Sequence, residues 1–501
     1  MKQKILLLLL VIFSISSFNA VSAQSQGDRL FEKAEGFHKK EYYVSAQKYY
    51  LKALKQYEKE NNREKALEAR YRVEVASGVL YDYPYTEDEI RSRIRELFPD
   101  LSQERTAELI SQMDYKVIEG EKKYESTFEP NIYYRNLDLM KSNKAKMEKA
   151  TDFSLRALSF AFQEPKSALD IKPWKPYINP IKFISTSSLI IPRVELPEKG
   201  IARIWMPYPI QTASQRNLEV ISIEPSKYCR RVPQTDDSIG VVYFEIPLEE
   251  IKDQLKIEIK NTFVSYEQYF QIDPQNIGEY DRESPDYKLY TRSERNIEIT
   301  PEIEKTARKI VGDETNPYLQ AEKIYSEIVK NVKYSYTPHL SLGLLEKSEN
   351  IYVHKHQFGD CGAQSMYFCA LCRSLGIPAR STGGYQAIPG LADSGGTHFW
   401  AEFYLPNYGW IPVDTTVAET MVYSDKLTAR QKEKLVDYYF GNLDRYRLII
   451  QKNVSIPVRP ATCYPPLFSV VFQIAVMEWD MTDQYPDYFN YYKMQMEPYG
   501  Y

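Results

Sequence analysis

The chain has 501 residues with 64 basic and 68 acidic side chains, so its formal net charge is −4. This near balance gives no electrostatic support for a nucleic-acid-binding surface, and the length suggests about three domains at about 150 residues each. After the first residues, no run reaches the roughly 18 apolar residues that a membrane-spanning helix requires.

The first 23 residues have the pattern of a signal peptide. Lys2 and Lys4 precede an apolar segment over 5–13, and small residues at 21–23 form a cleavage site. The apolar segment is too short to span a bilayer. We therefore expect an exported, soluble protein, periplasmic or secreted, whose mature chain begins at Gln24.

Residues 24–164 are predicted to form an all-α module. Apolar side chains at helical spacing over 27–80 have the pattern of one tetratricopeptide-like hairpin followed by a further helix. Thr86 with Glu89 forms a capping box, and Ser102 has the position of an N-cap. Helical hairpins often bind peptides, so this module is a candidate for binding a protein partner. The alternative is that it packs against the domains that follow.

A proline-rich linker over 165–182 is predicted to precede a β domain over 183–290. Strands are expected at 203–207 and 241–246. Apolar and charged side chains alternate over 255–260, which is the period of a half-buried strand.

The segment 295–445 has the pattern of an α+β unit. Thr300 before Pro301 marks a helix start, and a second amphipathic helix begins at Pro317. An apolar helix then begins near Cys361, and strands are predicted over 379–385, 398–405 and 410–414. Residues 446–501 are a tyrosine-rich C-terminal extension.

Cys361 is the candidate nucleophile. It follows Gly359 and Asp360, either of which can cap the helix and leave Cys361 in the first turn. Unpaired N–H groups and the positive end of the helix dipole stabilise a thiolate there, so we expect a pKa below about 8.5. The cysteine count of 5 is odd, which predicts at least one free thiol in an exported protein.

The other four cysteines have less informative surroundings. Cys369 and Cys372 have CxxC spacing but lie inside the helix that Cys361 opens, so we interpret them as small apolar helix residues. Cys229 and Cys463 can pair only if the fold brings them together.

His398 and Asp414 are the candidate partners of Cys361. A histidine moves protons to and from the reacting atoms, and an acid orients the imidazole. Glu402 is an alternative orienting group, because side chains alternate along a strand and Glu402 shares the face of His398.

The pairing of the last two predicted strands decides whether His398 and Asp414 meet. If 405–409 forms the hairpin loop, Tyr404 pairs with Trp410, and His398 and Asp414 become diagonal neighbours on one face. A loop one residue shorter would turn Asp414 to the other face.

The string His354-Lys355-His356 has a spacing that occurs in metal sites. Companion ligands are missing from the sequence around it, so we interpret it as part of the cleft rim. No metal and no cofactor are expected.

Four motifs resemble the transglutaminase-like superfamily: Gly359-Asp360-Cys361 and the stretches 372–380, 398–402 and 409–415. The resemblance covers residues 295–445. It implies an α+β, papain-like core in which a helix carrying the cysteine packs on an antiparallel sheet carrying the histidine and the aspartate. In that family's terms Cys361 is the nucleophile, His398 the general base and acid, and Asp414 the orienting acid. The β domain before the core is similar to the family's usual companion domain.

One part of the family's site is not recognisable. Animal members have an upstream tryptophan that completes the oxyanion hole, and this chain has none between Trp205 and Cys361. The backbone N–H of Cys361 is one expected donor, and the second-donor candidates are Tyr334, Tyr336 and Gln357. The calcium-binding acidic loops of the animal enzymes are not recognisable either.

The predicted function is an exported thiol enzyme that acts on peptide or protein amides through an acyl-thioester. Water as the second reactant gives a peptidase or amidase, which we favour, and a lysine amine gives a crosslink. The alternative is a non-enzymatic binding or scaffold protein with an inert core. A glycan-associated surface protein is a third hypothesis, suggested by the 42 tyrosines.

Overall fold

The computed structural model describes residues 24–161, 176–234, 237–388, 396–420, 423–462, 472–479 and 488–499. The predicted signal peptide, most of the predicted linker and Cys463 lie outside these residues, so the proposed pairing of Cys229 with Cys463 does too. The chain divides into two compact units, Met1–Ala76 and Ser77–Tyr501.

The first unit is built from helices, namely α1 (Gln26–His38), α2 (Tyr43–Lys59) and most of α3 (Arg63–Asp82). Ser25 caps α1, because its side chain accepts a hydrogen bond from the N–H of Asp28. Ala34, Ala46 and Tyr50 form a small buried core in this unit. The expected helices are present, and the tetratricopeptide-like character of the hairpin stays a prediction.

The second unit begins with more helices and one β-hairpin. These elements are α4 (Glu87–Leu97), α5 (Gln103–Ser111), β1 (Tyr115–Ile118), β2 (Glu121–Tyr124), α6 (Phe128–Arg135), α7 (Leu137–Ser142) and α8 (Lys144–Ala161). The capping box of Thr86 with Glu89 and the cap at Ser102 are confirmed. The all-α prediction for this region is wrong at β1 and β2. Glu119 and Gly120 both take positive φ there, at +52° and +86°, and make the tight turn that lets the strands pair.

The β domain contains two antiparallel sheets. Its strands are β3 (Tyr177–Pro192), β4 (Ile201–Pro207), β5 (Gln215–Glu224), β6 (Cys229–Arg231), β7 (Val241–Pro247) and β8 (Gln254–Tyr269). The three predicted strands are confirmed as parts of β4, β7 and β8. Residues 177–182 belong to β3 rather than to the linker, because β3 pairs with β8 along nearly its whole length.

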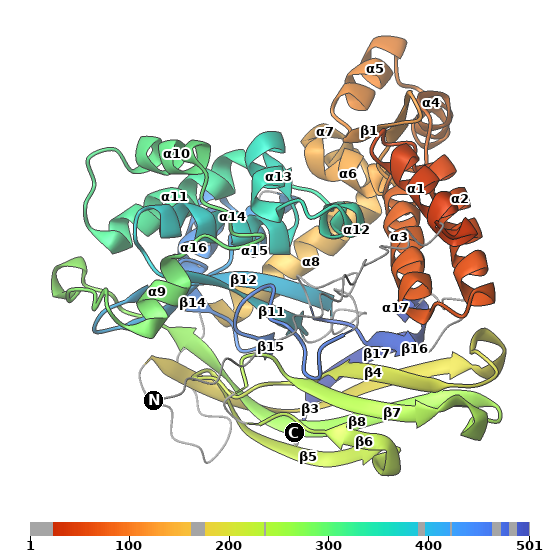
Figure 1. Ribbon diagram of the computed structural model, residues 1–501. Coiled ribbons are helices and arrows are strands. Elements are labelled where there is room, and N and C mark those ends of the chain that lie inside the picture. The colour runs from red at the N-terminus through yellow and green to blue at the C-terminus, as the bar shows by residue number, and fades with distance from the viewer. Residues whose placement is uncertain are drawn as a thin grey trace, which may run out of the picture. The chain divides into compact units, whose positions relative to one another are not determined.

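The C-terminal residues are part of the fold rather than an appendage. The segment contributes β15 (Arg447–Gln451), β16 (Val476–Trp479), α17 (Tyr488–Tyr491) and β17 (Tyr492–Pro498). β16 pairs with β4 and β17 pairs with β3, so both extend the sheets of the β domain, as Figure 1 shows. The strands β16 and β17 were not predicted, because polar-apolar alternation over so few residues is a weak pattern.

The core has helices α9 (Pro285–Thr291), α10 (Pro301–Val311), α11 (Pro317–Asn331), α12 (His339–Leu344), α13 (Glu349–His356), α14 (Cys361–Ser374), α15 (Thr415–Thr420) and α16 (Ala429–Tyr438). Its strands are β9 (Lys333–Tyr334), β10 (Phe358–Gly359), β11 (Ala379–Gln386), β12 (Gly396–Leu405), β13 (Gly409–Val413) and β14 (Asn442–Leu443). The helix starts predicted at Pro301 and Pro317 are confirmed.

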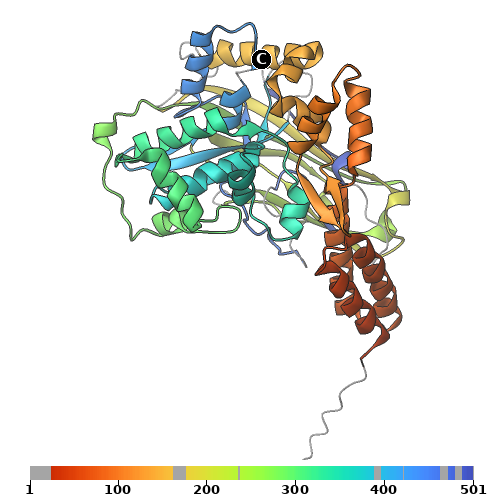
Figure 2. The ribbon, with the colours of Figure 1, turned by 90° about the horizontal axis from the view of Figure 1, so that it is seen from above.

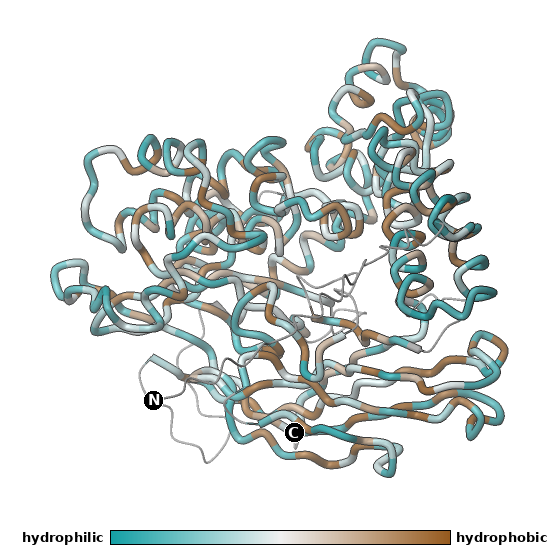
Figure 3. Tube along the Cα trace, viewed as in Figure 1, coloured by the Kyte–Doolittle hydropathy of each residue, from teal (hydrophilic) through white to brown (hydrophobic). Residues whose placement is uncertain are grey.

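The core sheet has the strand order β13-β12-β11-β15, with antiparallel neighbours. Helix α14 packs on β11 and β12, and Figures 1 and 2 show the teal helices of the core over these blue strands. In Figure 3 hydrophobic and hydrophilic stretches alternate along the helices and strands, as expected for elements with one buried face. The predicted α+β core, with a cysteine helix on an antiparallel sheet, is confirmed. No helix among the residues that the structure describes is long and apolar enough to cross a membrane.

Candidate functional site

Helix α14 begins at Cys361. Asp360 is the N-cap, with its Oδ1 accepting a hydrogen bond of 3.1 Å from the N–H of Ala363. The helix is buried on nearly all sides, and Cys369 and Cys372 are fully buried within it. This confirms their interpretation as apolar helix residues. Cys361 lies in the first turn of the helix because Asp360 caps it, and Gly362 follows Cys361.

Cys361 is half-buried at the start of α14, the helix that packs on β12, which is the strand that carries His398. Burial raises the pKa of the Cys361 thiol, and the nearby carboxylates of Asp360 and Asp414 raise it further, while a hydrogen bond from the backbone N–H of Phe399 acts the other way. The predicted lowering of the pKa is therefore wrong for the free protein, because desolvation outweighs the helix start.

Strands β12 and β13 have the predicted register. Tyr404 pairs with Trp410, as expected, and Leu405 also pairs with Gly409, so the loop is shorter than 405–409 without any change of register. Asn407 makes this possible by taking a φ of +73° in the loop.

The consequence of this register is a direct contact between His398 and Asp414. His398 Nε2 lies 2.8 Å from Asp414 Oδ2. Asp414 is completely buried, and the side chain of His398 is 12% exposed. With Nε2 bound to the carboxylate, Nδ1 is the ring nitrogen left for exchanging a proton with a thiol or a leaving group.

Sequence reasoning missed Arg447, which lies on β15 and holds Asp414 from the other side. Its Nη1 is 2.6 Å from Asp414 Oδ2, and its Nη2 is 2.7 Å from Asp444 Oδ2. Burial raises the pKa of Asp414, but the charges of His398 and Arg447 outweigh burial and hold this pKa below its usual value. The only indication of this role in the sequence was that Arg447 carries a charge directly before the apolar run 448–450.

Gly384 allows β15 to come this close. It lies opposite His398 in β11, and a Cβ at this position would be 1.8 Å from the carbonyl oxygen of Leu448. Only glycine therefore permits the approach that brings Arg447 to Asp414.

Glu402 does not orient His398. Its Oε2 lies 2.7 Å from Arg380 Nε and 2.6 Å from Arg380 Nη2. The guanidinium carbon of Arg380 also lies 4.0 Å from the ring centroid of Trp410. Glu402 lies on the same strand face as His398, but its carboxylate forms an ion pair with Arg380.

Tyr334 and Tyr336 lie close to Cys361. Burial raises the pKa of both phenols, and the negative charges of Asp360 and of a Cys361 thiolate raise them further. Gln357 is committed elsewhere, since its Nε2 donates a 2.7 Å hydrogen bond to the carbonyl oxygen of His354. Of the three candidate donors, the two tyrosines thus remain near the thiol.

The pair His354 and His356 has aromatic neighbours. His354 Nδ1 lies 3.3 Å from the hydroxyl of Tyr367, and the ring of His356 stacks on Tyr352 with centroids 4.5 Å apart. Within the part of the chain that the structure describes, no three or more His, Cys, Asp or Glu side chains are grouped to hold a metal ion.

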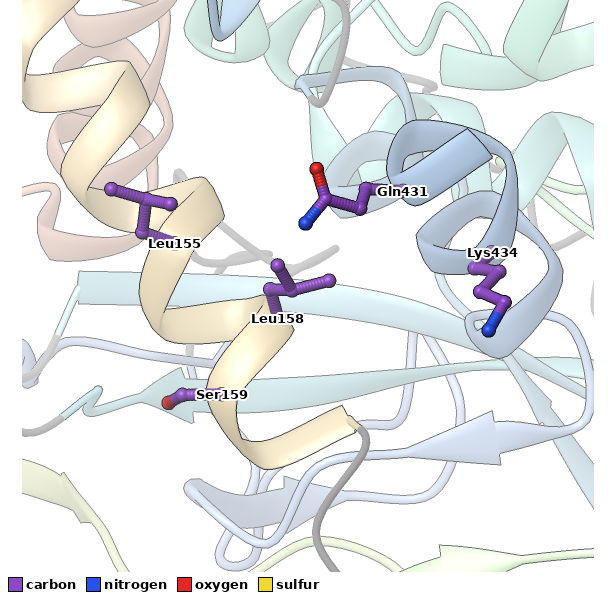
Figure 4. A pocket seen from close by; sticks show the side chains of 5 residues that line it. All are labelled: Leu155, Leu158, Ser159, Gln431 and Lys434. Carbon is purple, nitrogen blue, oxygen red and sulfur yellow. The ribbon is translucent and has the colours of Figure 1, made fainter. Parts of the chain in front are cut away.

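A pocket of about 440 Å³ lies between α8 and α16. Figure 4 shows the side chains that line it: Leu155, Leu158, Ser159, Gln431 and Lys434. Cys361, His398 and Asp414 do not line this pocket, so we do not assign it to the candidate site.

Comparison with known proteins identifies the core. A family model described as the transglutaminase-like superfamily matches residues 304–415. An uncharacterised protein of Haemophilus influenzae is 27% identical over 292 residues, which are 52% of this chain and 76% of that protein.

The comparison with solved structures found a proposed cysteine protease from Cytophaga hutchinsonii, which is 18% identical with a TM-score of 0.40 and covers 64% of this chain and 98% of its own. The periplasmic domain of TgpA from Pseudomonas aeruginosa is 13% identical with a TM-score of 0.21, covering 50% of this chain and 98% of its own. With the family match, the cysteine helix and the antiparallel sheet in agreement, the chain carries a transglutaminase-like domain.

Proposed function

We propose that this protein is a thiol enzyme that hydrolyses amide bonds of peptides or proteins, with Cys361, His398 and Asp414 as its catalytic residues. The observation that carries the proposal is the 2.8 Å contact of His398 Nε2 with the buried Asp414, beside the helix α14 that begins at Cys361 and packs on the strand of His398. This arrangement leaves Nδ1 of His398 as the base and Asp414 as the orienting acid.

The first half-reaction forms an acyl-thioester. Cys361 Sγ attacks the carbonyl carbon of the amide while its proton moves to His398 Nδ1. The carbonyl oxygen then carries the negative charge, and the backbone N–H of Cys361 with the phenol of Tyr334 are the proposed donors for it. The C–N bond breaks, and His398 returns the proton to the leaving amine.

The second half-reaction releases the acyl group. A water molecule attacks the thioester carbonyl while His398 takes one of its protons, and the C–S bond breaks to give a carboxylic acid. The proton on His398 then returns to the thiolate of Cys361. If a primary amine takes the place of water, the product is a new amide, which is transamidation.

The decisive experiment incubates the mature protein with a peptide library, with and without a primary amine, and reads products by mass spectrometry. We expect cleaved peptides that require Cys361, and amine adducts would instead indicate transamidation. The matched controls are Cys361→Ala and Cys229→Ala, which remove a cysteine inside and outside the site. Products that are identical for wild type and Cys361→Ala, or no products at all, would favour the scaffold hypothesis.

A second experiment tests coupling of the thiol to the imidazole. Burial raises the pKa of both Cys361 and Cys229, yet we expect iodoacetamide at neutral pH to label Cys361 faster, because His398 can take its proton as the sulfur attacks. His398→Ala should abolish this advantage, since the buried thiolate then lacks its counter-charge. Equal labelling of both cysteines in the wild type would contradict the activated thiol.

We also propose that the chain is exported through the segment 1–23. The basic start, the apolar run and the small-residue cleavage site support this. Expression of the full chain in a bacterium, with fractionation and N-terminal sequencing, should find a product that begins at Gln24 outside the cytoplasm. An uncleaved product in the cytoplasmic fraction would refute export.

A further inference from the structure

The extended segment 333–337 runs alongside the strand that leads into Cys361. β9, at its start, pairs in parallel with β10, the strand that leads into Asp360 and Cys361. The N–H of Ser335 continues this pairing with a 3.1 Å hydrogen bond to the carbonyl oxygen of Gly359. Side chains alternate along this extended segment, so Tyr334 and Tyr336 share one side, and both phenols are within electrostatic reach of Cys361.

The other edge of this segment is held by Asn131 on α6. Asn131 Oδ1 accepts a 2.7 Å hydrogen bond from the N–H of Tyr336, and Asn131 Nδ2 donates a 3.2 Å bond to the carbonyl oxygen of Tyr336. Asn131 is completely buried. Its amide thus makes the pair of hydrogen bonds that a neighbouring β-strand would otherwise make.

Neighbouring residues of α6 hold the same segment. Arg135 donates to the hydroxyl of Ser335 through Nε at 3.0 Å and Nη2 at 2.6 Å, and its Nη1 pairs with Glu125 Oε1 at 2.6 Å. The ring of Tyr134 lies 4.8 Å from that of Tyr334. Because Arg135 and Glu125 are both buried, water does not weaken these contacts.

We propose that Asn131 is a positioning residue for the reaction at Cys361. It holds the backbone at Tyr336, and through this short segment it sets where the phenol of Tyr334 meets the developing oxyanion. This inference rests on the proposed function. Asn131 lies outside residues 304–415, so a helix beyond the transglutaminase-like domain completes its cleft.

The test compares Asn131→Ala with Asn136→Ala. Asn136 is a matched control because it is also buried and its Nδ2 donates to the carbonyl of Ile132 rather than to the segment 333–337. We expect Asn131→Ala to lower kcat on a peptide found in the library by about tenfold or more, as for a misplaced oxyanion donor. Alkylation of Cys361 by iodoacetamide should change by less than about twofold, because that displacement develops no oxyanion.

A double-variant cycle makes the test specific. Tyr334→Phe removes the phenolic donor, so adding Asn131→Ala to it should cost little further kcat if Asn131 acts through Tyr334. Full additivity of the two losses would overturn the inference. So would a parallel loss of turnover and alkylation in Asn131→Ala, or a kcat no lower than that of Asn136→Ala. If Asn131→Ala does not fold, Asn131→Ser takes its place, because it is short and polar and places no second charge beside Glu125.

Hydrogen exchange separates this inference from the proposed function. A wild type without Cys361-dependent turnover overturns the proposed function alone. The exchange rate of the Tyr336 N–H then decides whether Asn131 holds the segment, and we expect about tenfold or faster exchange in Asn131→Ala but not in Asn136→Ala. Unchanged exchange would show that Asn131 does not hold Tyr336.

Discussion

At the scale of a single residue, the charge of Asp414 depends on its contacts with the imidazole of His398 and the guanidinium of Arg447. His398 and Arg447 both contact its Oδ2, at 2.8 Å and 2.6 Å. A carboxylate that is completely buried stays ionised only when its partners offset the cost of desolvation. The ionised form is the one that can hold the imidazole through its Nε2 proton.

We predict that Arg447→Met destabilises the protein by about 3–5 kcal/mol, because Asp414 and Asp444 lose a buried counter-charge. Loss of the arginine also raises the pKa of Asp414, so the acid limb of the pH–activity profile should move to higher pH. Urea unfolding and a pH series of turnover check both effects. Arg445→Met is the matched control, since Arg445 donates instead to the carbonyl of Asn179. Equal effects of the two variants would contradict this role for Arg447.

Glu419 is a second buried acid near the site, and its state is the reverse of that of Asp414. Burial raises its pKa to about 8, and hydrogen bonds from Gln364 and from the backbone N–H of Tyr334 oppose this only in part. The folded protein therefore keeps the proton on Glu419 above the pH at which the unfolded chain releases it. Stability from this group falls as the pH rises from about 4.5 to about 8.

We predict that Glu419→Gln removes this pH dependence. Relative to wild type, the variant should gain up to about 4 kcal/mol between pH 5 and pH 8, at about 1.4 kcal/mol per pKa unit. A glutamine can still accept the N–H of Tyr334, and Gln364 Oε1, which has no partner among the described residues, can accept from its amide. Urea unfolding at both pH values measures the gain. Exposed Glu433→Gln is the control, and a similar gain there would refute the assignment.

At the scale of elements, the half-exposed His339 stabilises the start of α14 by pairing with the buried carboxylates of Asp360 and Glu349. His339 Nε2 lies 2.6 Å from Asp360 Oδ2, and its Nδ1 lies 2.8 Å from Glu349 Oε1. Burial lowers the pKa of His339, but the charges of Asp360 and Glu349 outweigh burial and raise it well above its usual value. Asp82 is a further acid within electrostatic reach of His339. The helix that carries the nucleophile is thus capped by an aspartate with its own counter-ion.

We predict that His339→Gln destabilises the protein most below about pH 6.5, the unfolded-state pKa of histidine. The deficit relative to wild type should shrink as the pH rises through the raised pKa of His339, where the wild type loses the imidazolium. Urea unfolding at pH 6 and pH 9 checks this. His356→Gln serves as control, because burial lowers the pKa of His356. A deficit that is independent of pH would show that His339 is neutral.

At the scale of the whole molecule, residues far apart in sequence form the candidate site. Cys361, His398 and Asp414 come from the transglutaminase-like domain, Arg447 from the C-terminal segment and Asn131 from an N-terminal helix. All of them belong to the unit Ser77–Tyr501. The β domain is built into the same unit, since Gln215 Nε2 donates a 2.8 Å hydrogen bond to the carbonyl of Ile449 in β15.

We predict that a chain beginning at Arg63, which keeps α3 whole, retains Cys361-dependent turnover within about twofold of wild type. The site residues lie in the second unit, which has its own extensive hydrophobic core. A chain beginning at Leu137 should lose turnover, because it lacks α6. Circular dichroism shows whether each chain folds. Loss of turnover from a folded chain beginning at Arg63 would mean that α1 or α2 takes part in the reaction.

Local patterns in the sequence were sufficient for several features. The cap of α14 at Asp360, the helix starts at Pro301 and Pro317, and the register of β12 with β13 depend on neighbouring residues, turn chemistry and side-chain alternation. Contacts between residues close in sequence are specified by the chain itself, and the motifs around Cys361, His398 and Asp414 are of this kind. Their catalytic roles stay predictions.

Only the tertiary structure decided the electrostatics of the site. Desolvation outweighs the lowering of the Cys361 pKa that the helix start was expected to give, because burial depends on what packs over the helix from elsewhere. The roles of Arg447 and Asn131 could not be predicted for the same reason, since Arg447 lies 33 positions from Asp414 and Asn131 lies 205 positions from Tyr336. The chain by itself determined which residues have suitable chemistry and local geometry. The fold decided which charges and hydrogen-bond donors surround them, because desolvation and pairing are properties of the packed interior.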